Sequence, residues 1–168
     1  MKNKIIKIVL IVFLLVLMLD QGSKFLVTKF APNGLGNETF GFVITENTGM
    51  AFGFNQGNGK NIVLTIFVLL ILISFLKNQK NELDTKTIIA ISLAIGGGFS
   101  NLVDRIFRGG VLDFISIWKF PKFNIADICV CSAWVLIVIF LVLYSNKKDT
   151  IKSADLEELK IKDKEDKK

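Results

Sequence analysis

The sequence predicts an α-helical integral membrane protein with four transmembrane helices, a small extracytoplasmic β-element and an interfacial helix. Hydrophobic residues make up 51% of the 168 residues, and the mean hydropathy is +0.52. That composition is too apolar for an ordinary soluble domain of this size. The apolar residues also come in four long blocks, and each block approaches the roughly 20 residues that cross a bilayer.

The blocks set the expected spans at residues 5–28, 61–76, 87–105 and 124–144. The first resembles a secretory signal peptide because lysines precede its apolar centre. No small-residue processing site follows it, and the apolar pattern resumes after Asp20-Gln-Gly-Ser-Lys24, so we expect a retained helix. The spans form one membrane domain of residues 1–145, and residues 146–168 form a charged cytoplasmic tail.

Lysine placement predicts the orientation. The N-terminus, the 77–86 loop and the tail carry lysines, and an even number of spans puts all three on one side. The positive-inside rule makes that side the cytoplasm, so the net charge of +6 reflects membrane topology rather than nucleic-acid binding. Four cations fall on the other side and either bind substrate or headgroups or are ordinary loop charges: Arg105, Arg108, Lys119 and Lys122.

Two extracytoplasmic segments remain between the spans. In residues 30–60, we expect short strands over 39–45 and 50–54, forming a small sheet whose aromatic side chains rest on the membrane interface. Residues 106–123 mix aromatic and basic side chains, which is typical of a segment lying along the membrane surface.

The polar residues of the spans gather at one depth, on the extracytoplasmic side. Asp20 lies in the outer half of the first span, Asn47 in the outer loop, and Asp113 between the third and fourth spans. Two further groups each share a helix face: Asn101, Asp104 and Arg105, and then Asn124 and Asp127. Carboxylates within spans usually face a bundle interior or a water-filled cavity.

The alternative for these carboxylates is structural: Asp20–Lys24 and Asp104–Arg105 as ion pairs that fasten helices, and Asp113 and Asp127 as helix caps. The sequence has no histidine, so Ser116, Ser132 or a cysteine would lack the usual activating base. Cys129 and Cys131 would point about 200° apart on a helix, and we expect neither a disulfide nor a metal site from them.

Two aspartates in one site have a natural reaction, because close carboxylates share a proton. The ionised group draws a proton from water, which attacks an amide carbonyl that the protonated group polarises. This chemistry needs no metal or cofactor. A proton-coupled transporter would instead place its ionisable groups near the bilayer midplane, and a structural subunit would use them only as helix-fastening pairs.

Five segments resemble bacterial lipoprotein signal peptidase (signal peptidase II), an aspartic intramembrane peptidase family, and the resemblance extends to about Tyr144. In chain order they are Asp20-Gln-Gly-Ser-Lys24, Asn47-Thr-Gly-Met-Ala-Phe52, Gly97-Gly-Phe-Ser-Asn-Leu-Val-Asp-Arg105, Val111-Leu-Asp-Phe114 and Phe123-Asn-Ile-Ala-Asp127. Five motifs in order, each at its matching position, make a highly specific signal.

The resemblance implies that Asp113 and Asp127 are the catalytic pair. It also implies a set of substrate-binding or site-shaping residues: Asp20, Lys24, Asn47, Gly49, Asn101, Asp104, Arg105 and Asn124. The implied enzyme acts at the outer leaflet of the bacterial cytoplasmic (inner) membrane. Lysine placement puts both termini in the cytoplasm, and a single four-helix bundle could work alone, as a monomer. The implied partners are membrane lipids, globomycin-type cyclic peptide inhibitors and prolipoproteins, which it cuts just before a diacylglyceryl-modified cysteine.

Ser100 stands where the family usually has glycine, and we expect the small hydroxymethyl group to be tolerated. Gly96-Gly-Gly98 predicts a close helix–helix contact rather than direct contact with substrate.

Overall fold

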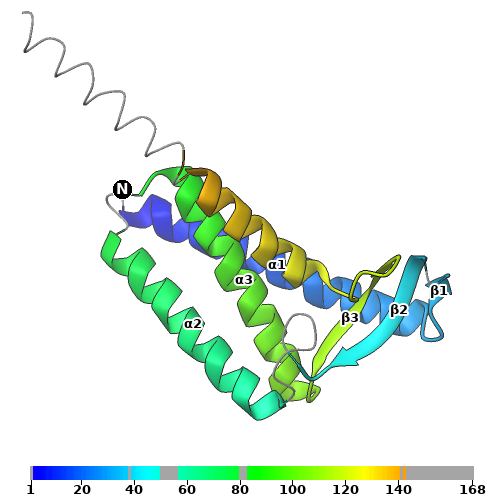
Figure 1. Cartoon of the computed structure of the whole chain (residues 1–168). Coiled ribbons are helices and arrows are strands. Elements are labelled where there is room, and N and C mark those ends of the chain that lie inside the picture. Colours follow the sequence, from blue (N-terminus) through cyan, green and yellow to red (C-terminus); the bar gives the residue numbers. More distant parts are fainter. Residues whose placement is uncertain (1, 38, 50–56, 80–82, 141, 143–168) are drawn as a thin grey trace, which may run out of the picture.

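The computed structural model describes residues 2–37, 39–49, 57–79, 83–140 and 142. Figure 1 shows its long helices side by side: α1 (Lys2–Phe30), α2 (Asn58–Gln79), α3 (Thr85–Phe107) and an unlabelled helix over Ile125–Phe140. Three of them are long and apolar enough to cross a membrane, and Ile125–Phe140 is a shorter apolar helix. Each predicted span thus contains a helix, and α1 continues unbroken through the polar stretch at Asp20. A full crossing by the fourth helix stays a prediction.

Helix α3 is the centre of the bundle, because its three consecutive glycines each face a different helix. A Cβ at Gly96 would lie 3.0 Å from Val16 of α1, and one at Gly98 would lie 3.2 Å from Leu69 of α2. A Cβ at Gly97 would lie 2.5 Å from the carbonyl oxygen of Ala126, at the start of the helix Ile125–Phe140. The glycines therefore serve helix packing, as the sequence predicted.

A three-stranded antiparallel sheet lies at the end of the bundle opposite the N-terminus (Figure 1). Its order is β1 (Leu35–Gly36), β2 (Phe40–Asn47) and β3 (Val111–Ile117). The predicted strand over 39–45 is confirmed as β2, whereas the expected strand over 50–54 lies outside the described residues.

The expectation that residues 106–123 lie along the membrane surface stays a prediction, and the longest regular element of this segment after α3 is a strand rather than a helix. Val111 to Ile117 pair with β2, with Asn47 opposite Val111 and Thr45 opposite Asp113. The segment contains no described helix after Phe107, where α3 ends. Pairing with a distant strand decided its conformation, because strand formation depends on cross-strand neighbours more than on local composition. The expected interfacial helix is therefore not confirmed.

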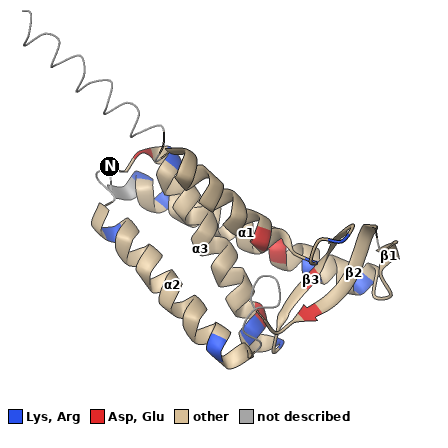
Figure 2. Cartoon of the chain, viewed as in Figure 1, with Lys and Arg blue, Asp and Glu red and all other residues tan. Residues whose placement is uncertain are grey.

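Charged residues avoid the middle of the bundle, apart from a cluster on α1 and α3 near the sheet (Figure 2). The apolar face of α2 between Lys60 and Lys77 is free of charge. A long uncharged stretch of this kind is what a membrane-spanning helix requires. The buried charged side chains of the described residues are therefore concentrated on α1, α3 and β3, near the sheet.

Candidate active site

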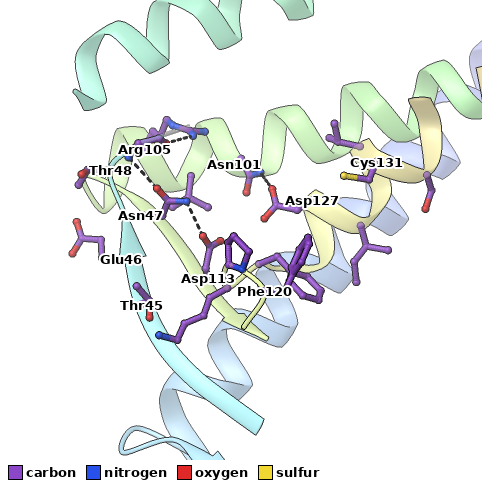
Figure 3. Close-up of a pocket in the computed structure, with 18 residues that line it drawn as sticks. Thr45, Glu46, Asn47, Thr48, Asn101, Arg105, Asp113, Phe120, Asp127 and Cys131 are labelled. Carbon is purple, nitrogen blue, oxygen red and sulfur yellow. Dashed lines mark hydrogen bonds between the residues drawn. The ribbon is translucent and has the colours of Figure 1, made fainter. Parts of the chain in front are cut away.

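A cavity of about 700 Å³ lies where the sheet meets the bundle (Figure 3). β2, α3, β3 and the helix Ile125–Phe140 all contribute to its wall. Six of the predicted site residues line it: Asn47, Gly49, Asn101, Arg105, Asp113 and Asp127. The other four lie behind this wall and are fully buried: Asp20, Lys24, Asp104 and Asn124.

Asp113 enters the cavity from β3 and is only 2% exposed. Its Oδ2 accepts a hydrogen bond from Asn47 Nδ2 at 2.9 Å, and its Oδ1 accepts one from Asn124 Nδ2 at 2.7 Å. Burial raises the pKa of Asp113 to about 6, the negative charge of Asp127 acts in the same direction, and the Asn47 hydrogen bond opposes both. Asp113 therefore retains a proton at a pH where an ordinary aspartate has lost it.

Asp127 lies in the first turn of the helix Ile125–Phe140, where it forms a reciprocal cap with Asn124. The Asp127 backbone N–H donates to Asn124 Oδ1 at 2.9 Å, and the Asn124 backbone N–H donates to Asp127 Oδ2 at 3.2 Å. This is the geometry of a capping box. The predicted capping role is thus confirmed for Asp127, and its half-buried carboxylate also faces the cavity. Asp113 caps no helix, because it lies within β3.

Asparagine amides connect the two aspartates. Asn101 Nδ2 donates to Asp127 Oδ1 at 2.8 Å, and Asn124 Nδ2 donates to both Asp113 Oδ1 and Asn101 Oδ1. Each of the four carboxylate oxygens therefore accepts one N–H hydrogen bond. Among the described residues, neither carboxylate has an ion-pair partner. Such a pair can exchange a proton with a bound substrate or water.

Arg105 lies beside the aspartates but does not pair with Asp104, contrary to the sequence expectation. Its Nη2 donates to the Gly49 carbonyl at 3.1 Å, and Figure 3 shows the side chain turned toward the β2 end of the cavity. The Gly49 N–H in turn donates to Asn47 Oδ1 at 3.0 Å. Arg105 and Asn47 thus hold the chain after β2 against the site.

The family model described as "Signal peptidase (SPase) II" matches residues 12–143. The chain belongs to this family. The lipoprotein signal peptidase of Buchnera aphidicola subsp. Acyrthosiphon pisum (strain Tuc7) is 39% identical over 154 residues, covering 83% of this chain and 91% of that protein. The protein of the same name from Anaplasma marginale (strain Florida) is 32% identical over 174 residues, covering 96% and 99%.

A solved structure titled "Bacterial membrane enzyme structure by the in meso method at 2.3 A resolution" has the same fold. It superposes with a TM-score of 0.71 at 27% identity, covering 82% of this chain and 88% of that one. A second structure, with the same title at 1.9 Å, gives a TM-score of 0.67 at 28% identity. The chain is thus a membrane protease of the signal peptidase II family.

Behind the cavity, this member of the signal peptidase II family holds a buried ion cluster. Lys24 Nζ lies 2.6 Å from Asp20 Oδ2 and 2.7 Å from Asp104 Oδ2. Arg108 lies 2.5 Å from Asp104 Oδ1. The predicted Asp20–Lys24 ion pair is confirmed, whereas Asp104 pairs with Lys24 and Arg108 instead of Arg105. The cluster balances two carboxylates with two cations.

Two uncharged residues of the cluster were not among the predicted site residues. Ser100 Oγ donates to Asp20 Oδ2 at 2.7 Å, and Gln21 Nε2 donates to Ser100 Oγ and Asp104 Oδ1, both at 3.0 Å. The hydroxyl at position 100 is therefore a hydrogen-bonding group rather than a packing intrusion. Gln21 lies within the first motif, but nothing in the sequence indicated that it would meet α3.

The four cations that the sequence placed on the extracytoplasmic side form two pairs. Arg105 and Arg108 are bound within the protein, as described above. Lys119 lies over the Trp118 ring at 5.8 Å, and Lys122 lines the cavity. Cys129 and Cys131 are both free thiols. No group of three His, Cys, Asp or Glu side chains in the described part of the chain is arranged to hold a metal ion.

Proposed function

We propose that this chain is an intramembrane aspartic endopeptidase that removes the signal peptide from diacylglyceryl-modified prolipoproteins. The observation that carries the proposal is the convergence of Asp113 and Asp127 on one cavity, with every carboxylate oxygen bound by an N–H donor. The names of the relatives support the substrate class, because the Buchnera and Anaplasma proteins are lipoprotein signal peptidases. The cut falls just before the lipid-bearing cysteine.

The two carboxylates take complementary roles in the reaction. The ionised one removes a proton from a water molecule as that water attacks the scissile carbonyl, while the protonated one donates a hydrogen bond to the carbonyl oxygen. In the resulting tetrahedral intermediate, a proton passes to the amide nitrogen and the C–N bond breaks. Asp113 and Asp127 lie on separate elements, so a peptide segment between them can be reached from both sides.

Arg105 and the asparagines supply the polar contacts that a substrate backbone needs. Arg105 is tied to the Gly49 carbonyl through Nη2, and its cation faces the cavity that the aspartates share. A positive charge there stabilises the oxyanion as it forms. Asn47 and Asn101 hold the carboxylates and border the same space, so the site positions its catalytic groups before a substrate arrives.

The apolar part of the cavity fits the lipid that marks the substrate. Beyond Asp127 the wall continues along the helix Ile125–Phe140 through Ile128 and Val130, and Phe120 and Phe123 approach from the connection. Acyl chains bind such surfaces, because their burial is driven by the apolar area removed from water. The enzyme works as a monomer in the bacterial cytoplasmic membrane, with both termini cytoplasmic and the cavity at the outer leaflet. Globomycin-type cyclic peptides compete for the same cavity.

Cleavage of a defined precursor tests the proposal. The purified chain in detergent is incubated with a prolipoprotein bearing a diacylglyceryl cysteine, beside the unlipidated precursor, and the products are mapped by mass spectrometry. We expect cleavage of the lipidated precursor alone, before its cysteine. Asp113→Asn and Asp127→Asn should fold normally and lose about 10²- to 10⁴-fold in kcat.

Each alternative gives a different result. Turnover that persists in both aspartate variants would place the chemistry elsewhere in the molecule. If the chain is instead a structural subunit, Asp113→Asn should lower the thermal midpoint as strongly as it lowers any activity. Equal cleavage of both precursors would reject the lipid-dependent substrate class while leaving the aspartic mechanism intact.

A further inference from the structure

Lys24 lies outside the cavity, yet it contacts a residue that binds the aspartate pair. Its side chain is fully buried, and a lysine ammonium has three N–H donors. Two of them face Asp20 Oδ2 and Asp104 Oδ2, and the third faces Asn101 Oδ1 at 3.4 Å. All three donors therefore have an acceptor, and one acceptor belongs to the wall of the site.

The Lys24 contact determines which way the Asn101 amide points. Asn101 Oδ1 accepts hydrogen bonds from both Lys24 Nζ and Asn124 Nδ2, and Asn101 Nδ2 donates to Asp127 Oδ1. In the reversed orientation, the Asn101 amino group would face the Lys24 ammonium and the Asn124 amino group, so three donors would meet without an acceptor. Its carbonyl would then face the Asp127 carboxylate. Both contacts are unfavourable, and the charge on Lys24 increases the difference.

We propose that Lys24 is a positioning residue for the aspartate pair: its ammonium fixes the direction of the Asn101 amide, so that this amide donates to Asp127. The inference rests on the proposed function, because it concerns the same two carboxylates. Without the ammonium, only the Asn124 hydrogen bond to Oδ1 favours this direction of the Asn101 amide, so the amide turns more often and Asp127 loses its donor for a larger part of the time. The Asp127 carboxylate then no longer keeps one orientation toward the substrate.

The direct substitution Lys24→Met leaves two buried carboxylates short of a cation and is expected to fold poorly. A charge-balanced variant avoids this problem. Lys24→Met combined with Asp20→Asn removes one charge of each sign and leaves the Asp104–Arg108 pair in place. Its reference is Asp20→Asn alone, which keeps Lys24 and its contact with Asn101.

Steady-state cleavage of the lipidated precursor gives the decisive comparison. Relative to Asp20→Asn, we expect the double variant to lose about tenfold or more in kcat, with KM changed less than about twofold, because the aspartates and not the substrate contacts are disturbed. A kcat within about twofold of the reference, in a folded double variant, would overturn the proposal.

A mutant cycle with Asn101→Ala shows whether Lys24 acts through Asn101. If it does, removing Lys24 when Asn101 is already alanine should change kcat by less than about twofold, whereas independent effects would multiply. Multiplying effects would overturn the proposal.

Ser100→Ala is the matched control, because it removes a hydrogen bond to Asp20 from the same cluster without touching Lys24 or Asn101. It should lower the thermal midpoint and leave kcat within about twofold of wild type. If Ser100→Ala lost as much kcat as the double variant, any damage to the ion cluster would lower activity. The specific role of Lys24 would then be overturned. Wild-type cleavage that Asp113→Asn abolishes keeps the proposed function standing whatever the Lys24 result.

Discussion

Asn124 donates a hydrogen bond from Nδ2 to Oδ1 of Asn101 at 3.1 Å, so the two amides that bind the aspartate pair also bind each other. The direction of the Asn124 amide is fixed independently, because its Oδ1 accepts the backbone N–H of Asp127. Its Nδ2 must then face Asn101 and Asp113. The fully buried side chain of Asn124 thus fixes the position of Asp113 on β3 relative to Asp127 on the last helix.

Asn124→Ala should therefore damage both activity and stability. The substitution leaves Asp113 Oδ1 and the Asp127 N–H without their partners, and unsatisfied buried groups cost about 1–3 kcal/mol each. We expect a fall of about 2 kcal/mol or more in the free energy of unfolding and a loss of about 10²-fold in kcat. Chemical unfolding in detergent and precursor cleavage measure the two effects.

Ser92→Ala is the control for that loss. Ser92 is also fully buried, but its Oγ donates only to the Ile88 carbonyl one turn earlier in α3, away from the cavity. It should cost less than about 1 kcal/mol and leave kcat unchanged. If both variants lost activity equally, the loss would reflect bundle stability rather than the amide clamp.

The raised pKa of Asp113 makes stability depend on pH. Its pKa is about 6 in the folded chain against 3.8 for an ordinary aspartate, so the native state binds this proton more tightly than the unfolded state does. Relative to Asp113→Asn, the stability of the wild type should fall as pH rises from about 4 to about 6 and then level off, by an amount on the order of 3 kcal/mol. Asp113→Asn should lack this contribution, because its side-chain amide does not titrate in this range. A difference between the wild type and Asp113→Asn that stays constant across this window would contradict the assignment.

Local sequence determines the helices and the conjunction of Asp113 with Asp127. Long apolar blocks predict the helices, and the short connection between α3 and the last helix forces the two aspartates to the same end. The ion-pair partner of Asp104 could also have been predicted from helix spacing. Arg108 is four residues away on the same helix face, whereas Arg105 points about 100° from Asp104.

Contacts between distant segments could not be predicted in the same way. β3 forms because Val111–Ile117 finds β2, more than 60 residues earlier, and composition alone favoured a surface segment there. Ser100 and Gln21 meet only because α1 packs against α3, where Gly96 allows the close approach to Val16. No periodicity within either helix indicates that a glutamine on one will bind a serine on the other.

Gly97 offers a test of the packing that supports the site. A Cβ there would lie 2.5 Å from the Ala126 carbonyl oxygen and 2.8 Å from Val130, so Gly97→Ala must push the last helix away from α3. Asp127 follows Ala126 directly and would move with it. We expect a cost of about 1–3 kcal/mol in stability and a clear loss of kcat, measured by thermal unfolding and precursor cleavage.

Gly22→Ala is the matched control for Gly97→Ala. It lies within α1 with nothing within 4 Å of its Cβ position, so alanine should be neutral there or stabilise the helix by up to about 1 kcal/mol. Unchanged activity in Gly97→Ala would mean that the last helix can shift without disturbing Asp127.

The proposed orientation can be tested by cysteine labelling from outside intact cells. In a background carrying Cys129→Ser and Cys131→Ser, Lys119→Cys places a thiol beside the exposed Trp118 at the sheet end, and Lys77→Cys places one in the last turn of α2 at the other end. A membrane-impermeant maleimide should label Lys119→Cys in intact cells, and Lys77→Cys only after permeabilisation. The result matters for function, because a precursor lipidated at the outer leaflet can reach the aspartates only if the sheet end faces outward. Labelling in the reverse order would put the cavity on the cytoplasmic face and remove the basis for the proposed substrate.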